Sequence, residues 1–96
     1  MDKTHTPMPF PLHISAESHC ESADAPTLLR RFIEQASHQY DVTILSPVSG
    51  TPTQADATIS VPFADRERFR ITFNIFASEM DDTYGTGLFV HMESAF

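Results

Sequence analysis

Cysteine, lysine and glycine are scarce in this 96-residue chain, and the first two shortages exclude whole classes of site. A single cysteine, Cys20, cannot form an internal disulfide or a multi-cysteine zinc site. Lys3 is the only lysine, and six basic residues against thirteen acidic ones leave a net charge of −7. This charge argues against nonspecific binding to DNA, RNA or anionic membranes.

Long apolar runs are also missing. No stretch approaches the roughly 20 apolar residues that span a bilayer. The N-terminus lacks the basic start, apolar core and cleavage site of a signal peptide. We therefore expect no membrane contact and a cytoplasmic location. Apolar residues make up 41% of the chain, which is ordinary for a globular domain, and the length suits one domain.

The first half of the chain predicts an arm, a strand and a helix. Residues 1–9 are polar and hold two prolines, which favours an extended, mobile N-terminal arm, so the folded domain is expected over 10–96. Apolar and polar residues then alternate over Phe10–Glu17, as in a half-buried strand. Over Leu28–Tyr40 the apolar residues recur at helical spacing, and Asp24 can cap this amphipathic helix.

The second half of the chain predicts four strands, at residues 41–48, 57–63, 69–75 and 88–93. Alternation is cleanest over 69–75, which is expected to form a β-hairpin with 57–63. The acidic stretch 78–87 is expected to be a loop. The predicted fold is a single α+β domain in the order β-α-β-β-β-β, with one amphipathic helix packed on one face of a mostly antiparallel sheet of about five strands.

The histidines and the cysteine are the residue types that could bind a metal. His13 and His91 would share the open face of the sheet, which the helix does not cover, if the first and last strands are neighbours. A small metal or ligand site of His13, His91 and Cys20 is one alternative, and solvated histidines without a ligand are the other. No recognised ligand spacing is present, so we expect no cofactor and no metal. The open face is further expected to carry Arg68, Arg70, Thr72, Asn74, Phe76 and Phe89.

Motifs for catalysis are absent as well. The chain has no Ser-His-Asp elbow, His-Glu-x-x-His, Cys-x-x-Cys or P-loop. Cys20 could act as a nucleophile with His19 or His38 as its base, but we find no third residue to orient the histidine. Nearby carboxylates, among them Glu21, are expected to raise the pKa of the thiol. We therefore expect no enzymatic activity.

Two acidic groups are the candidate partner-binding residues. The first lies in the predicted loop before the last strand, and the second lies in the predicted connection before strand 69–75. The first group does not match a calcium-binding loop, which leaves a solvated loop or a protein contact as its use. The predicted partner-binding residues are Glu79, Asp81, Asp82 and Tyr84 in the first group, and Asp65 and Glu67 in the second.

Charge, size and missing motifs together favour a small non-enzymatic interaction module. Acidic surfaces meet basic ones in fast, salt-sensitive association. The expected function is an inhibitor or decoy that occupies a basic surface of a partner protein, without direct contact to nucleic acid. Phage- or plasmid-encoded anti-defence proteins, anti-CRISPR proteins among them, are similar in size, charge and lack of motifs. The alternative is a homodimer of structural role, formed through the aromatic open face or an edge strand.

Overall fold

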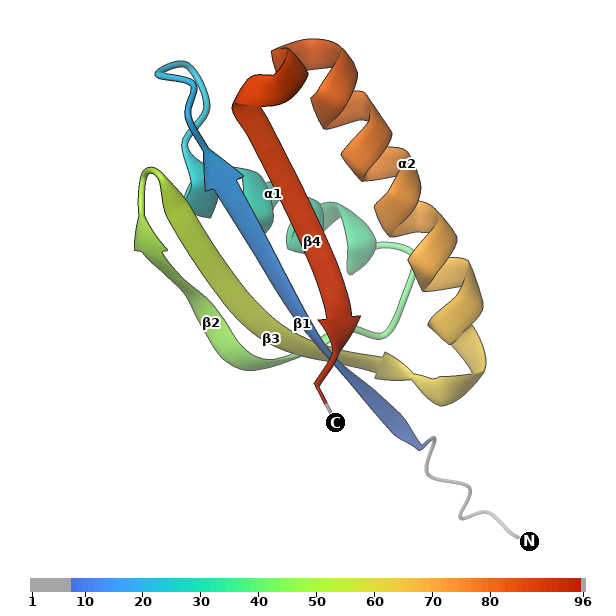
Figure 1. Cartoon of the computed structure of the whole chain (residues 1–96). Coiled ribbons are helices and arrows are strands. Elements are labelled where there is room, and N and C mark those ends of the chain that lie inside the picture. Colours follow the sequence, from blue (N-terminus) through green and yellow to red (C-terminus); the bar gives the residue numbers. More distant parts are fainter. Residues whose placement is uncertain (1–7, 96) are drawn as a thin grey trace, which may run out of the picture.

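Within residues 8–95, four strands and two α-helices make up the fold (Figure 1). The computed structural model describes residues 8–95, so most of the predicted N-terminal arm, residues 1–7, and Phe96 lie outside the described residues. In chain order the elements are β1 (Pro9–Ser18), α1 (Ala25–Ala36), β2 (Thr43–Thr51), β3 (Gln54–Pro62), α2 (Arg66–Tyr84) and β4 (Leu88–Ser94). Short 3₁₀ turns at Phe63–Asp65 and Gly85–Gly87 flank α2.

The strands form one antiparallel sheet in the order β2-β3-β1-β4. β3 separates β1 from β2, and β1 separates β3 from β4, so each helix connects two strands that are not neighbours (Figure 1). This is the ferredoxin-like arrangement of two split β-α-β units. A single α+β domain with an antiparallel sheet is confirmed. The predicted order β-α-β-β-β-β and the count of about five strands are wrong, since the described chain has four strands in the order βαββαβ.

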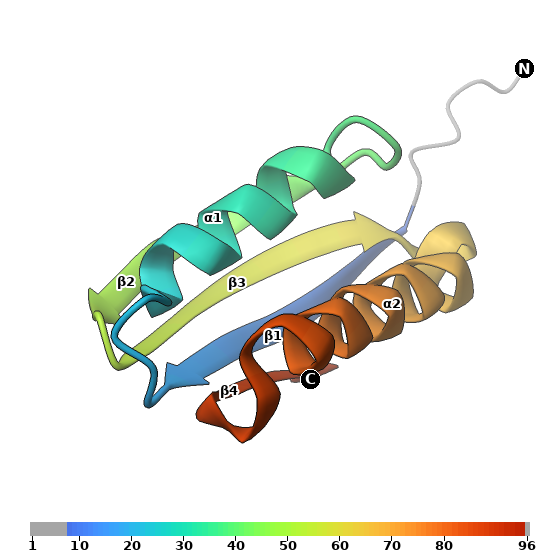
Figure 2. The ribbon, with the colours of Figure 1, turned by 90° about the horizontal axis from the view of Figure 1, so that it is seen from above.

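Both helices pack on the same face of the sheet. Seen from above, α1 lies over β3 and α2 runs along β4 (Figure 2). The ring of Phe32 on α1 joins the two helices, since it lies 5.7, 5.4 and 4.7 Å from the rings of Phe69, Phe73 and Phe76 on α2. Beneath them the sheet contributes Leu12, Ile14, Ala16, Ala55, Ala57, Ile59 and Val61. The other face of the sheet is not covered by either helix.

Helix α1 begins where the sequence predicts. The carboxylate of Asp24 accepts a hydrogen bond from the backbone N–H of Thr27 at 3.0 Å and another from its hydroxyl at 2.7 Å. The first of these bonds satisfies a backbone donor that the first turn leaves unpaired. The helix ends at Ala36, earlier than the predicted Tyr40, although Tyr40 is still buried in the core.

Removing the cap at Asp24 is expected to lower the midpoint of thermal unfolding by several degrees in Asp24→Ala, whereas Asp24→Asn keeps an acceptor and loses less. The Thr27 hydroxyl and backbone N–H hold the pKa of the Asp24 carboxyl below its usual value. The charged form therefore stabilises the fold above the unfolded pKa of about 3.9, and this contribution is lost as pH falls through the lower folded pKa.

Thermal unfolding at pH 7 and at pH 2.5 measures this effect. The difference between wild type and Asp24→Asn should shrink as the pH falls from 7 to 2.5, because the charged form that stabilises the wild type becomes less populated. Equal midpoints for wild type and Asp24→Ala at pH 7 would contradict the capping role.

Helix α2 occupies the stretch for which the sequence analysis predicts a strand and an acidic loop. Alternation over seven residues fits a strand, but the buried residues of the longer stretch are Phe69, Phe73 and Phe76, with half-buried Met80 packing against them. Their spacing of four, three and four is that of one face of a helix. Neither proline nor glycine interrupts the 19 residues, and Gly85, at a φ of 63°, follows the last turn.

The observed hairpin joins β2 and β3, not residues 57–63 and 69–75. Its turn lies at Pro52 and Thr53, where the hydroxyls of Thr51 and Thr53 are 3.1 Å apart. β2 is a sheet edge with two irregularities in its register against β3. It also contains Pro47, which cannot donate a backbone hydrogen bond, so this edge is poorly suited to pairing with a further strand.

Candidate functional site

The acidic group Glu79, Asp81 and Asp82 lies on the last turns of α2, not in a loop as predicted. All three side chains are exposed. Within residues 8–95 none of them forms a side-chain hydrogen bond or ion pair. Successive residues of a helix differ by about 100° in direction, so these carboxylates fan out around the exposed side of α2. We call these three residues the acidic end of α2.

The acidic end lies at the C-terminal end of α2, where the helix dipole disfavours negative charge. Negative charge is stabilising near a helix N-terminus and unfavourable near the C-terminus, by about 0.3–1 kcal/mol per charge at exposed sites. The last turn of α2 contains no basic residue that would offset this cost. Folding of the helix therefore does not account for three carboxylates at this end.

Two isoleucines are exposed on the same helix. Ile71 and Ile75 have relative exposures of 52% and 57% and lie one turn apart, pointing away from the core. They continue a line of exposed residues that runs along α2. This line, which we call the outer face of α2, consists of Arg68, Ile71, Ile75, Ser78 and Asp82.

The second predicted acidic group, Asp65 and Glu67, lies at the opposite end of α2. Both carboxylates already have partners there: Asp65 is 3.7 Å from Arg68, and Glu67 is 3.0 Å from Arg70. Glu79 lies twelve positions after Glu67 along the helix, which is about 18 Å. The two predicted groups therefore do not form one patch.

Tyr84 differs from its acidic neighbours because it is half-buried. It packs against a small cluster of Ala23, Leu28 and Leu88 that closes the end of the domain. Its ring thus helps to hold α2 against α1 and β4. Any part that Tyr84 plays in binding would come from its exposed portion.

The open face of the sheet differs from the prediction. Arg68, Arg70, Thr72 and Asn74 are on α2, and Phe76 is in the core. Phe89, at 55% exposure, and His91 do lie on the open face, opposite Glu17 and Ser15 of β1.

His13 and His91 lie on this face, on the neighbouring strands β1 and β4. His13 lies opposite Glu93 and is 4.0 Å from Asp56, while His91 is 3.3 Å from Glu93. Cys20 lies beyond the end of β1, about 20 Å along the chain from His13 at strand spacing. Among residues 8–95 no three potential ligands gather around a common point.

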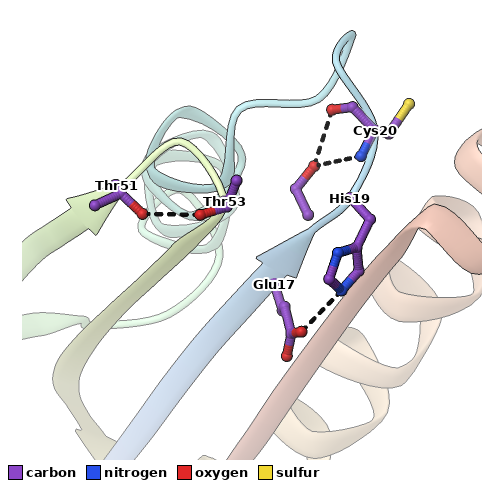
Figure 3. Close-up of polar contacts among 6 residues, drawn as sticks. Glu17, His19, Cys20, Thr51 and Thr53 are labelled. Atoms are coloured by element: carbon purple, nitrogen blue, oxygen red, sulfur yellow. Dashed lines mark hydrogen bonds and ion pairs between the residues drawn. The ribbon is translucent and has the colours of Figure 1, made fainter.

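Cys20 and His19 do not form a nucleophile and base pair. The imidazole of His19 points to Glu17, at 2.8 Å, and the sulfur of Cys20 points away from it (Figure 3). The sulfur lies 3.0 Å from the hydroxyl of Ser22. Hydrogen bonds from the Ser22 hydroxyl and backbone N–H lower the pKa of the Cys20 thiol, so the predicted upward shift is wrong. The charge of Glu21 opposes this shift but is the smaller influence.

A shallow groove of about 210 Å³ runs between α1 and α2 beside the exposed isoleucines. Ile75 and Glu79 line one wall, and Gln35 and Gln39 of α1 line the other. The groove therefore joins the outer face of α2 to the acidic end. Neither helix within residues 8–95 has both the length and the apolar character needed to cross a bilayer.

Comparison with known protein families gives no match for this chain, and comparison with curated proteins gives none either.

Proposed function

We propose that the protein is a small acidic, non-enzymatic interaction module that occupies a basic surface of a partner protein, as an inhibitor or decoy acting in the cytoplasm. The observation that carries this proposal is the acidic end of α2. Its three carboxylates are exposed, have no counter-charge within residues 8–95, and lie at the end of the helix that disfavours them. A basic partner would supply the missing counter-charge.

The isoleucines next to the acidic end extend this surface. Protein interfaces combine an apolar centre with a polar rim. Ile75 and Glu79 are one turn apart on α2, so a partner that covers the carboxylates also reaches the isoleucine. Charge would then set the rate and salt dependence of association, and burial of Ile75 would add affinity.

The size and charge of the chain suggest the biological setting of this role. Phage- and plasmid-encoded anti-defence proteins, anti-CRISPR proteins among them, share the small size, the net negative charge and the lack of catalytic motifs. We propose the same kind of activity here, directed at a protein and not at nucleic acid. The ferredoxin-like fold itself does not select this function, because one fold serves many.

Affinity capture tests the proposal. The tagged chain is used as bait in lysate of the native host at low and at moderate salt, and bound proteins are identified by mass spectrometry. We expect a stoichiometric partner with a basic surface that is released as salt increases. A partner held equally at both salt concentrations, or no stoichiometric partner at all, would contradict the proposal.

A further inference from the structure

We propose that the outer face of α2 is also a self-association surface, on which α2 of a second copy of this chain packs antiparallel. The five residues of this face, Arg68, Ile71, Ile75, Ser78 and Asp82, are spaced three and four apart in alternation. That spacing defines the contact line of two helices packed side by side. All five are exposed, and two of them are isoleucines.

The charges of this line are self-complementary. Arg68 lies seven positions before Ile75 and Asp82 lies seven positions after it. A two-fold axis beside Ile75 therefore places Arg68 of each copy opposite Asp82 of the other, and Ile75 against Ile75. The Arg68 side chain is 74% exposed, and its contact with Asp65 is 3.7 Å, so it is accessible to a second carboxylate.

Two other arrangements of the helix pair bring like charges together. Moving the axis between Ile71 and Ile75 would place Glu67 at the level of Glu79 of the second copy. A parallel pair would place Asp82 against Asp82. Like charges placed together are unfavourable, so electrostatics favours the antiparallel register with the axis at Ile75 over these two arrangements.

The same arrangement explains the position of the acidic end. In an antiparallel pair the C-terminal end of one helix lies beside the N-terminal half of the other. Asp82 then meets Arg68 near the positive end of the second helix dipole, and Glu79 and Asp81 are brought closer to that end. α2 lies on the outside of the domain, beside β4, so a second copy can approach its outer face (Figures 1 and 2).

The dimer is expected to be weak and to compete with the partner proposed above. A single helix pair buries less than the roughly 1,200 Å² of a stable interface, so we expect a Kd on the order of 0.1–1 mM. The inference does not rest on the proposed function, because it concerns the chain alone. If both hold, a basic partner displaces the second copy from Asp82.

Sedimentation equilibrium of the purified chain at low salt tests the inference. The average mass should rise from that of one chain toward that of two as concentration increases, and high salt should reverse the rise. Arg68→Asp and Asp82→Arg should each remain monomeric, because each brings like charges together in its own dimer. Mixed in equal amounts, the two variants should associate again, since both charge pairs are then restored.

Three results would overturn the inference. These are a wild-type chain that stays monomeric at about 1 mM, at the upper end of the expected Kd range, single variants that dimerise as well as wild type, or a mixture that shows no recovery. Circular dichroism checks that each variant is folded. Should a charge variant not fold, Ile75→Lys serves in its place, and dimerisation of that variant at the wild-type concentration would equally contradict the proposal.

Discussion

Replacing Phe69 with alanine is expected to reduce the free energy of unfolding by about 3–5 kcal/mol. The ring is fully buried, with 0% exposure, and lies 5.7 Å from the ring of Phe32 and 5.2 Å from that of Tyr40. Alanine leaves a cavity between the two helices that these neighbours cannot fill. Since domains are stable by only about 5–15 kcal/mol, the variant should be close to unfolding.

Ile71→Ala is the matched control, two residues away on the same helix. Ile71 points outward at 52% exposure, so its removal should change stability by no more than about 0.5 kcal/mol. In the strand that the alternation predicts, Phe69 and Ile71 would share the buried face, and both changes would be costly. Urea denaturation of the two variants distinguishes the helix from the strand. A similar large loss of unfolding free energy in both variants would contradict the assignment of α2.

The second large effect is expected at Gly50 in β2. Its φ is 137°, a backbone conformation that residues with a side chain rarely adopt. In addition, a Cβ at this position would lie 2.7 Å from the Cα of Ala55 and against the carbonyl oxygen of Gln54. Both neighbours are backbone of the paired strand and cannot move aside. We expect Gly50→Ala to cost about 3 kcal/mol or more, from backbone strain and steric overlap together.

Gly85 provides the comparison for this prediction. It also has a positive φ, of 63°, but no atom lies within 4 Å of an added Cβ. Gly85→Ala should therefore lose only the conformational part, about 1–3 kcal/mol, since a φ of 63° with a ψ of −139° is a backbone conformation that other residues rarely adopt. Urea denaturation of Gly50→Ala and Gly85→Ala under identical conditions separates the cost of steric overlap from the cost of backbone strain. A greater loss at Gly85 than at Gly50 would contradict the close approach of β2 and β3.

Local signals in the sequence were sufficient for much of the fold. Alternation identifies β1, β3 and β4 because these strands have one buried and one solvated face. Asp24 followed by Pro26 and helical spacing identifies the start of α1, and the cap is observed as expected. The strand order could not be derived in this way, because pairing between distant strands leaves no local pattern.

The error at α2 has a physical cause. Over seven residues, Phe69, Ile71, Phe73 and Ile75 alternate as well as any strand, and short apolar stretches do not separate helix from strand. The deciding signal lies beyond Ile75, where Phe76 and Met80 continue the helical spacing of the phenylalanines. The helical spacing becomes visible only when the stretch considered extends to Met80.

The same error affected the candidate site. Charge alone identifies the acidic residues, but the strand predicted over 69–75 places them in a loop and not on a helix. The same predicted strand buries Ile71 and Ile75, so it does not predict them as surface residues. On the observed helix, Ile71 and Ile75 are exposed and lie next to the acidic end.

The central claim, that the acidic end of α2 binds a basic partner, is tested most directly by two triple charge reversals. One replaces Glu79, Asp81 and Asp82 with lysine, and the other replaces Glu17, Asp56 and Glu93 with lysine on the open face of the sheet. Both change the net charge equally, and all six side chains are exposed.

Affinity for the captured partner is measured for both variants by titration calorimetry at one salt concentration. We expect the first variant to lose at least about tenfold in affinity and the second to stay within about threefold of wild type, because close charge pairs outweigh distant ones. Unchanged affinity of the first variant, or equal losses in both, would contradict the claim.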